Sequence, residues 1–131
     1  MKPIPIGSKG TFSKTIAKAD LASELDSSLA SVMSTPTMIG MMELAAMDAI
    51  NAYYDAGESS VGMSIEVSHT AATPPGHRVR AEAELTKAEG HRLEFKVTAF
   101  DETEQIGAGT HRRAVIDAAK FTDRIKAKQK N

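Results

Sequence analysis

The sequence has no cysteine and no tryptophan, and only 5% of its 131 residues are aromatic. Without cysteine there is no disulfide, no thiolate nucleophile and no zinc site with cysteine ligands. This absence is typical of intracellular proteins, and we expect a cytoplasmic location. The amino end lacks the apolar core of a signal peptide, and no run elsewhere approaches the length of a membrane span, so no membrane partner is expected.

The sequence also lacks an excess of charge of either sign, since 17 acidic residues face 16 basic ones and the formal net charge is -1. Such a chain has no global field that attracts DNA or RNA, and no nucleic-acid partner is expected. Its 41% hydrophobic and 25% charged residues are ordinary for a globular protein. The length predicts one domain over residues 1–131.

One stretch is far more apolar than the rest and is predicted to be a helix. Ser34-Thr35-Pro36 is typical of a helix start, because a hydroxyl can cap free amides and proline suits the first turn. The stop signal is Gly57. The apolar positions between them leave almost no polar face in the first turns: Met38, Ile39, Met41, Met42, Leu44, Met47 and Ile50. The pattern predicts a buried helix at the centre of the fold.

After Gly57 the hydrophobic period changes to two, as in strands with one buried side. The inward positions are predicted to be Val61, Met63, Ile65, Val67 and His69, then Val79, Ala81, Ala83 and Leu85, then Leu93, Phe95, Val97 and Ala99. A further strand is expected over 106–116 and an edge strand over 11–18. The turns at 73–76 and 89–91 favour an antiparallel meander of the last four strands. Residues 18–34 are interpreted as a short helix or mobile lid, and 118–131 as a basic helix or tail.

These elements predict an α+β fold in which one antiparallel sheet wraps around one long central helix. The helix is too apolar to be covered by one sheet alone. An open flank would be a large apolar patch, so a symmetric homodimer is expected.

Three motifs, "TPTMIGMMELAAM", "SHTAATPPG" and "GAGTHRRAVI", resemble the fluoroacetyl-CoA thioesterase-like family of hotdog enzymes. The resemblance runs from about Gly7 to Phe121, and HTAATPPG is its most specific part. It implies a hotdog fold, an acyl-CoA substrate, and a homodimer or higher hotdog oligomer. It also implies a catalytic set of Thr35, Glu43 and His69, with Gly62 and Arg113 supporting substrate binding.

Taken without the resemblance, each catalytic candidate has a structural alternative. Glu43 is costly among apolar neighbours unless it is paired or functional, and it could simply form an ion pair with an arginine. Thr35 could be an ordinary helix cap, and His69 a satisfied core histidine. His111 is either a strand-face residue or a contact to substrate. No pair of histidines has metal-ligand spacing with a nearby carboxylate, so neither a metal nor another cofactor is expected.

Thioester hydrolysis needs a base, donors for the oxyanion and a group that orients the base. His69 is the predicted base, Glu43 its orienting group, and backbone amides near Gly62 or the helix start are oxyanion donors. Thr35 either attacks the acyl carbon or only donates a hydrogen bond. Because Thr35 and Glu43 lie about 12 Å apart along a continuous helix, we expect a composite site, with Thr35 of one protomer meeting Glu43 or His69 of the other.

Arg113 is also a candidate for contact with coenzyme A phosphates, whereas the basic tail is better explained as a solvated helix face. Gly107 and Gly109 are interpreted as relief for a closely packed or bulged strand.

The leading functional hypothesis is an acyl-CoA thioesterase for a small or short acyl group, with a fluoroacetyl-like group among the candidates. The lid contains no aromatic residue, so no aromatic gate over the acyl group is predicted. Two alternatives remain: a non-catalytic acyl-CoA-binding hotdog dimer, and a hotdog hydratase.

Overall fold

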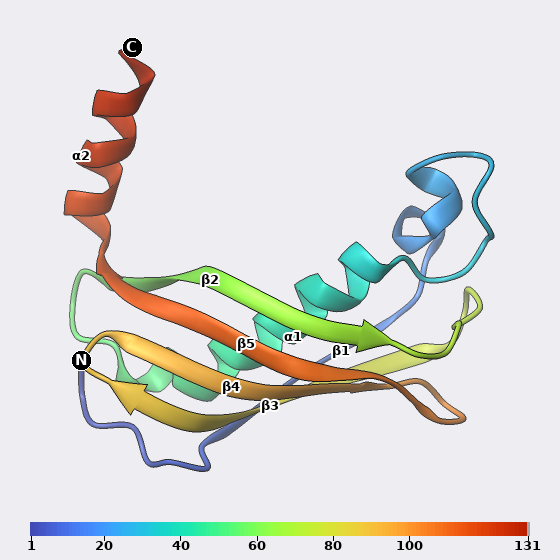
Figure 1. Ribbon diagram of the computed structural model, residues 1–131, viewed down its shortest axis with the longest axis horizontal. Helices are drawn as coiled ribbons and strands as arrows, with labels where there is room; N and C mark the ends of the chain where they lie inside the picture. Colours follow the sequence, from blue (N-terminus) through green and yellow to red (C-terminus); the bar gives the residue numbers. More distant parts are fainter. Residues whose placement is uncertain (131) are drawn as a thin grey trace.

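The computed structural model describes residues 1–130, and its five strands curve around one long helix (Figure 1). The strands are β1 (Lys9–Thr15), β2 (Glu58–His69), β3 (Arg78–Glu89), β4 (Arg92–Phe100) and β5 (Gln105–Asp117). The helices are α1 (Thr35–Ile50) and α2 (Ala118–Gln129), with short 3-10 turns η1 (Lys18–Asp20), η2 (Ala22–Glu24) and η3 (Asn51–Tyr53). The expected α+β hotdog architecture, one antiparallel sheet around one central helix, is confirmed.

The core lies between α1 and the concave face of the sheet. Residues of α1 with fully buried side chains, among them Met38, Met42 and Ala45, pack against the inward positions of β3 and β4. A methyl group on Gly10 of β1 would lie 2.2 Å from the carbonyl oxygen of Ala45, so β1 rests directly on the helix backbone. The central position predicted for this helix follows from its composition.

The predicted meander is wrong for one strand. The strand order is β1-β3-β4-β5-β2, so β2 pairs with β5 and not with β3. The free edge of β3 is occupied by β1, which matches the edge position expected for the first strand. The connection over residues 70–77 carries two prolines and is too long for a tight hairpin, so the chain crosses to the far edge of the sheet instead.

The predicted alternation in β2 also fails at one point. The register with β5 shifts between Gly62 and Ser64, which makes Met63 the extra residue of a β-bulge. One inserted residue exchanges the two faces of a strand. Before the bulge Ser60 and Gly62 face inward, and after it Ile65 does, whereas Met63 is 57% exposed and not buried as predicted.

Several boundaries differ from those predicted. The first strand occupies 9–15 and not 11–18, and α1 ends at Ile50, followed by η3, well before Gly57. The lid segment, 18–34, holds η1 and η2 and is tied down at its base by a bridge between Leu21 and Met33. The carboxylate of Asp20 accepts hydrogen bonds from Lys14 Nζ at 2.7 Å and from the backbone amide of Ala17 at 2.9 Å.

The lid segment and α2 lie at opposite ends of the molecule (Figure 1). The tail is helical, as one of the two sequence interpretations predicted, and none of its described residues is buried. No helix within residues 1–130 combines the length and the apolar character needed to cross a membrane.

Candidate functional site

The first residue of α1 and the last residue of β2 meet in the same chain. Thr35 Oγ1 lies 2.8 Å from His69 Nδ1. The hydroxyl of Thr35 is available for this contact because the preceding residue caps the helix: Ser34 Oγ accepts from the amide of Thr37 at 3.2 Å. The alternative in which Thr35 is only a helix cap is therefore wrong.

His69 is an imidazole with one nitrogen engaged and one available. Its Nε2 is buried and has no hydrogen-bond partner of ordinary geometry among residues 1–130. Burial lowers the pKa of His69 below its usual value of 6.5, and a weaker backbone interaction with Ala71 opposes this. A neutral imidazole that accepts a hydrogen bond from a hydroxyl can serve as a general base toward that hydroxyl.

A shallow cavity of about 300 Å³ opens over this pair. One side is formed by the lid segment and the helix start, and the other by the residues that follow β2; besides the pair it is lined by Ala22, Val32, Met33, Ser34, Thr70, Ala71 and Ala72. The lining is dominated by small side chains. An acyl group of a few atoms fits this space beside the hydroxyl and the imidazole.

The other three predicted residues form a second cluster, where Glu43, Gly62 and Arg113 come together. Arg113 Nη1 lies 3.3 Å from Glu43 Oε2, so the carboxylate in the apolar helix is paired with an arginine, as one alternative expected. A Cβ on Gly62 would lie 3.2 Å from the same carboxylate oxygen and 3.7 Å from Arg113 Nη1. A hollow of about 280 Å³ opens there, lined by Glu43, Gly62, Met63, Ser64, Ile65 and His111.

The five predicted residues thus form two groups within one chain. Thr35 and His69 need no second protomer to meet, so that part of the composite-site hypothesis is wrong. Glu43 lies eight residues further along α1, about 12 Å from Thr35 along the axis, and does not reach His69 of its own chain.

The contact of Arg113 with coenzyme A phosphates stays a prediction, and the structure shows Arg113 held by groups of its own chain. Its side chain is 4% exposed, and its guanidinium donates to Ser60 Oγ at 2.9 Å and to the Ser60 carbonyl oxygen at 3.1 Å in addition to Glu43.

The glycines of β5 relieve close packing, as the sequence predicted. A Cβ on Gly107 would lie 2.5 Å from Met38 Sδ, and one on Gly109 would lie 2.0 Å from the Glu66 carbonyl oxygen.

Sequence reasoning did not identify the residues that hold Arg113. These are Ser60, which also accepts a hydrogen bond from the Tyr54 hydroxyl at 2.6 Å, and His111, whose Nε2 lies 3.2 Å from Arg113 Nη1. The available signal was the spacing of His111 and Arg113, which at i and i+2 in a strand share one face.

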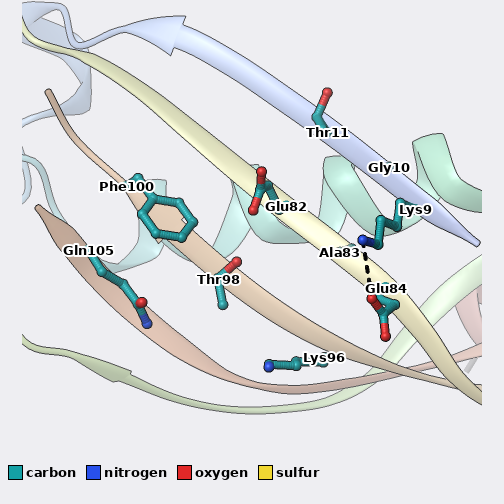
Figure 2. A pocket seen from close by; sticks show the side chains of 10 residues that line it. All are labelled: Lys9, Gly10, Thr11, Glu82, Ala83, Glu84, Lys96, Thr98, Phe100 and Gln105. Carbon is teal, nitrogen blue, oxygen red and sulfur yellow. Dashed lines mark ion pairs between the residues drawn. The ribbon is translucent and has the colours of Figure 1, made fainter. Parts of the chain in front are cut away.

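A third hollow, of about 330 Å³, lies on the outer face of the sheet, over β1, β3 and β4 (Figure 2). Figure 2 shows Glu82, Lys96 and Phe100 over the strands with α1 behind them, and a dashed line marks the ion pair between Lys9 and Glu84. Lys9 Nζ lies 3.7 Å from Glu84 Oε1. The residues that line this outer hollow include none of the predicted site residues.

Within residues 1–130 there is no group of three or more metal-ligating side chains that could hold a metal ion.

The comparison with known proteins agrees with the motifs. A family model described as fluoroacetyl-CoA-specific thioesterase matches residues 16–119. A fluoroacetyl-CoA thioesterase of Streptantibioticus cattleyicolor is 47% identical over 97 residues, which is 74% of this chain and 70% of that protein.

Solved structures show the same fold. A mutant of the fluoroacetyl-CoA-specific thioesterase, in complex with fluoroacetate and CoA, is 39% identical with a TM-score of 0.86, covering 90% of this chain and 99% of that one. A Thermus thermophilus member of the thioesterase superfamily is 30% identical with a TM-score of 0.93, covering 99% and 96%. The chain belongs to the fluoroacetyl-CoA-specific thioesterase family of hotdog proteins.

Proposed function

We propose that the protein is an acyl-CoA thioesterase for a small acyl group of the fluoroacetyl-CoA type. The observation that carries this proposal is the contact of 2.8 Å between the Thr35 hydroxyl and the His69 imidazole below a small cavity. The curated relative acts by name on fluoroacetyl-CoA, which favours this substrate more strongly than the lid sequence did. The absence of an aromatic lid residue therefore does not argue against it.

In the proposed reaction His69 is the general base. For Thr35 to donate to Nδ1, the neutral ring must carry its proton on Nε2. Nδ1 then removes a proton from Thr35, which attacks the thioester carbon, or from a water held at the same place. The C–S bond breaks, CoA leaves as the thiol after accepting the proton from His69, and water hydrolyses any acyl-enzyme. These steps use side chains alone, without a cofactor.

The start of α1 supports this chemistry electrostatically. The N-terminus of a 16-residue helix carries partial positive charge, and Thr35 is its first residue. Negative charge that develops on the thioester carbonyl oxygen beside Thr35 is therefore stabilised. The neutral form of His69, favoured by burial, keeps the base available at the same place.

A second copy of the chain is proposed to complete the site. The protonated Nε2 of His69 needs an acceptor, and the chain's own Glu43 is too far away. Strand β2 is at the edge of the sheet, and beside it Met63 is 57% exposed and Leu44 of α1 is 42% exposed. An unpaired edge with exposed apolar side chains favours pairing with another chain. We assign Glu43 of that second copy to His69 Nε2, giving two composite sites per homodimer.

The test is release of free thiol from acetyl-CoA, fluoroacetyl-CoA and medium-chain acyl-CoAs, with His69→Ala as the control. The proposal expects fast release from the smallest substrates and a loss of about 10²-fold or more in the variant. If the wild type binds acyl-CoA but releases no thiol, the protein is instead a non-catalytic binding module. If His69→Ala retains full activity, the assigned base is wrong.

A further inference from the structure

The guanidinium of Arg113 is held not only by Glu43 but also by Ser60 and His111, which have no assigned catalytic role. It donates from Nε to Ser60 Oγ, from Nη2 to the Ser60 carbonyl oxygen, and from Nη1 to both Glu43 Oε2 and the imidazole of His111. These contacts use four of the five N–H donors of an arginine. Three of these contacts, two to Ser60 and one to His111, therefore fix the orientation of the guanidinium independently of Glu43.

His111 is placed to act as an acceptor. Its Nδ1 lies 2.9 Å from the carbonyl oxygen of Ser64, and because a carbonyl can only accept, Nδ1 carries the proton. The other nitrogen, Nε2, is then unprotonated in the neutral ring and accepts from Arg113 Nη1 at 3.2 Å. A protonated ring would place an N–H against the guanidinium and lose this contact.

The surroundings of His111 keep the ring neutral and fixed. The side chain is 1% exposed and stacks on Phe95, with ring centroids 6.2 Å apart and an interplanar angle of 28°. Burial is the largest influence and lowers the pKa of His111; the nearby charge of Arg113 also lowers it, whereas the Ser64 carbonyl and Glu43 oppose the shift. Ser64 itself follows the β-bulge at Met63, where the ladder to β5 is interrupted.

We propose that His111 is a positioning residue, whose neutral Nε2 turns the Nη1 group of Arg113 so that its second N–H points at Glu43 Oε2. Held in this way, Glu43 has a defined direction and offers its other oxygen, Oε1, to the imidazole that it orients. Gly62 leaves the arrangement open, since a Cβ there would lie 3.5 Å from His111 Cε1 and 3.2 Å from the carboxylate. This inference rests on the proposed function, in which Glu43 orients the catalytic base.

Two substitutions distinguish the contributions of the two ring nitrogens of His111. His111→Gln can place an amide oxygen near the position of Nε2 and keep an acceptor for Arg113. His111→Asn can donate to the Ser64 carbonyl oxygen near the position of Nδ1, but leaves Arg113 without that acceptor. We expect His111→Asn to lower kcat by about tenfold to a hundredfold, as for loss of other orienting contacts, and His111→Gln to recover most of it.

A double-mutant cycle with Glu43→Gln tests whether the effect passes through Glu43. We expect His111→Asn to have little further effect on kcat once Glu43 is replaced, because the group that it positions is absent. An equal loss of kcat in both backgrounds would mean that His111 only supports the fold, and the inference would be overturned. Full kcat in His111→Asn would overturn it as well.

A measurement on the wild-type protein does not depend on turnover or on folded variants. The ¹⁵N chemical shifts of the His111 ring near neutral pH should show a neutral ring protonated at Nδ1. A ring protonated at Nε2, or at both nitrogens, would overturn the inference even in an active enzyme. If instead the wild type releases no thiol while the ring is neutral and protonated at Nδ1, it is the proposed function that fails.

Discussion

At the scale of single residues, the two nitrogens of His69 have different tasks. Nδ1 faces the hydroxyl of Thr35, whereas Nε2 is buried and has no acceptor of ordinary geometry within residues 1–130. Burying an N–H without an acceptor costs free energy, about 1–3 kcal/mol. In the proposed homodimer, a carboxylate that a second chain brings to Nε2 would remove this cost and favour the imidazolium that forms during the reaction.

The pH dependence of activity tests that arrangement. A base must be neutral, so kcat/KM falls as the pH decreases through the pKa of His69. Burial lowers this pKa below 6.5, whereas a carboxylate at Nε2 raises it. In Glu43→Gln the effect of burial remains and that of the carboxylate is lost. We expect the acid limb of kcat/KM in this variant to lie below pH 6.5 and below the limb of the wild type. If the acid limbs of kcat/KM coincide in the two proteins, Glu43 does not act on His69.

Adjacent hydroxyls at the start of α1 are expected to differ in what they contribute. Ser34 is buried and caps the helix, so Ser34→Ala should lower the free energy of unfolding by about 1 kcal/mol. Within residues 1–130 the Thr35 hydroxyl hydrogen-bonds only to the base, so Thr35→Ala should leave stability nearly unchanged and lower kcat by roughly 10²-fold or more. Chemical denaturation and thiol release on both variants check this. A larger stability loss for Thr35→Ala than for Ser34→Ala would contradict it.

At the scale of elements, two glycines on neighbouring strands have different functions. A Cβ on Gly109 of β5 would lie 2.0 Å from the Glu66 carbonyl oxygen, a backbone atom that cannot move without shifting β2. One on Gly62 of β2 would mainly meet the carboxylate of Glu43 at 3.2 Å, which can move slightly. We expect Gly109→Ala to destabilise the protein by at least about 2 kcal/mol, and Gly62→Ala to fold well but lose activity. Thermal denaturation and thiol release measure the two effects, and the reverse order would refute them.

The sequence predicted the elements better than their pairing. The hairpin of β3 and β4 alternates cleanly up to Leu85, where its register shifts, and has a turn at Gly90; alternation and turn are both local signals. The pairing of β2 with β5 joins distant segments, and the bulge at Met63 inverts the strand's phase without a strong local signal. The site residues were identified by motif, but register decides which of them meet. Hence only the structure shows that Thr35 meets His69 within one chain. The spacing of His111 and Arg113 places them on one face of a strand, and the structure adds the contact between them.

At the scale of the whole molecule, the edge strand β2 contributes residues to both clusters, the one with Thr35 and His69 and the one with Glu43 and Arg113. β2 carries His69 at its end and Gly62 near its bulge, and its outer edge belongs to no strand of the described chain. If two copies pair through this edge in antiparallel fashion, centred between Gly62 and His69, the end of one β2 lies beside the middle of the other. Such a pairing brings Thr35 and His69 of one copy toward Glu43 and Gly62 of its partner.

Mixed dimers test this assignment directly. Co-expressing Thr35→Ala chains with Glu43→Ala chains under different affinity tags yields heterodimers in which one of the two composite sites has every native residue. Each purified heterodimer should therefore recover about half of wild-type activity, although both parent homodimers are inactive.

The matched control is a heterodimer of Thr35→Ala with His69→Ala. Because these two residues act from the same chain, both of its sites are damaged, and it should remain as inactive as its parents. Recovery in this control would mean that Thr35 and His69 act from different chains, contrary to their contact within one chain. No recovery in the Thr35→Ala and Glu43→Ala heterodimer would show that Glu43 serves the His69 of its own chain. Recovery only in the latter heterodimer would place the orienting carboxylate across the dimer interface.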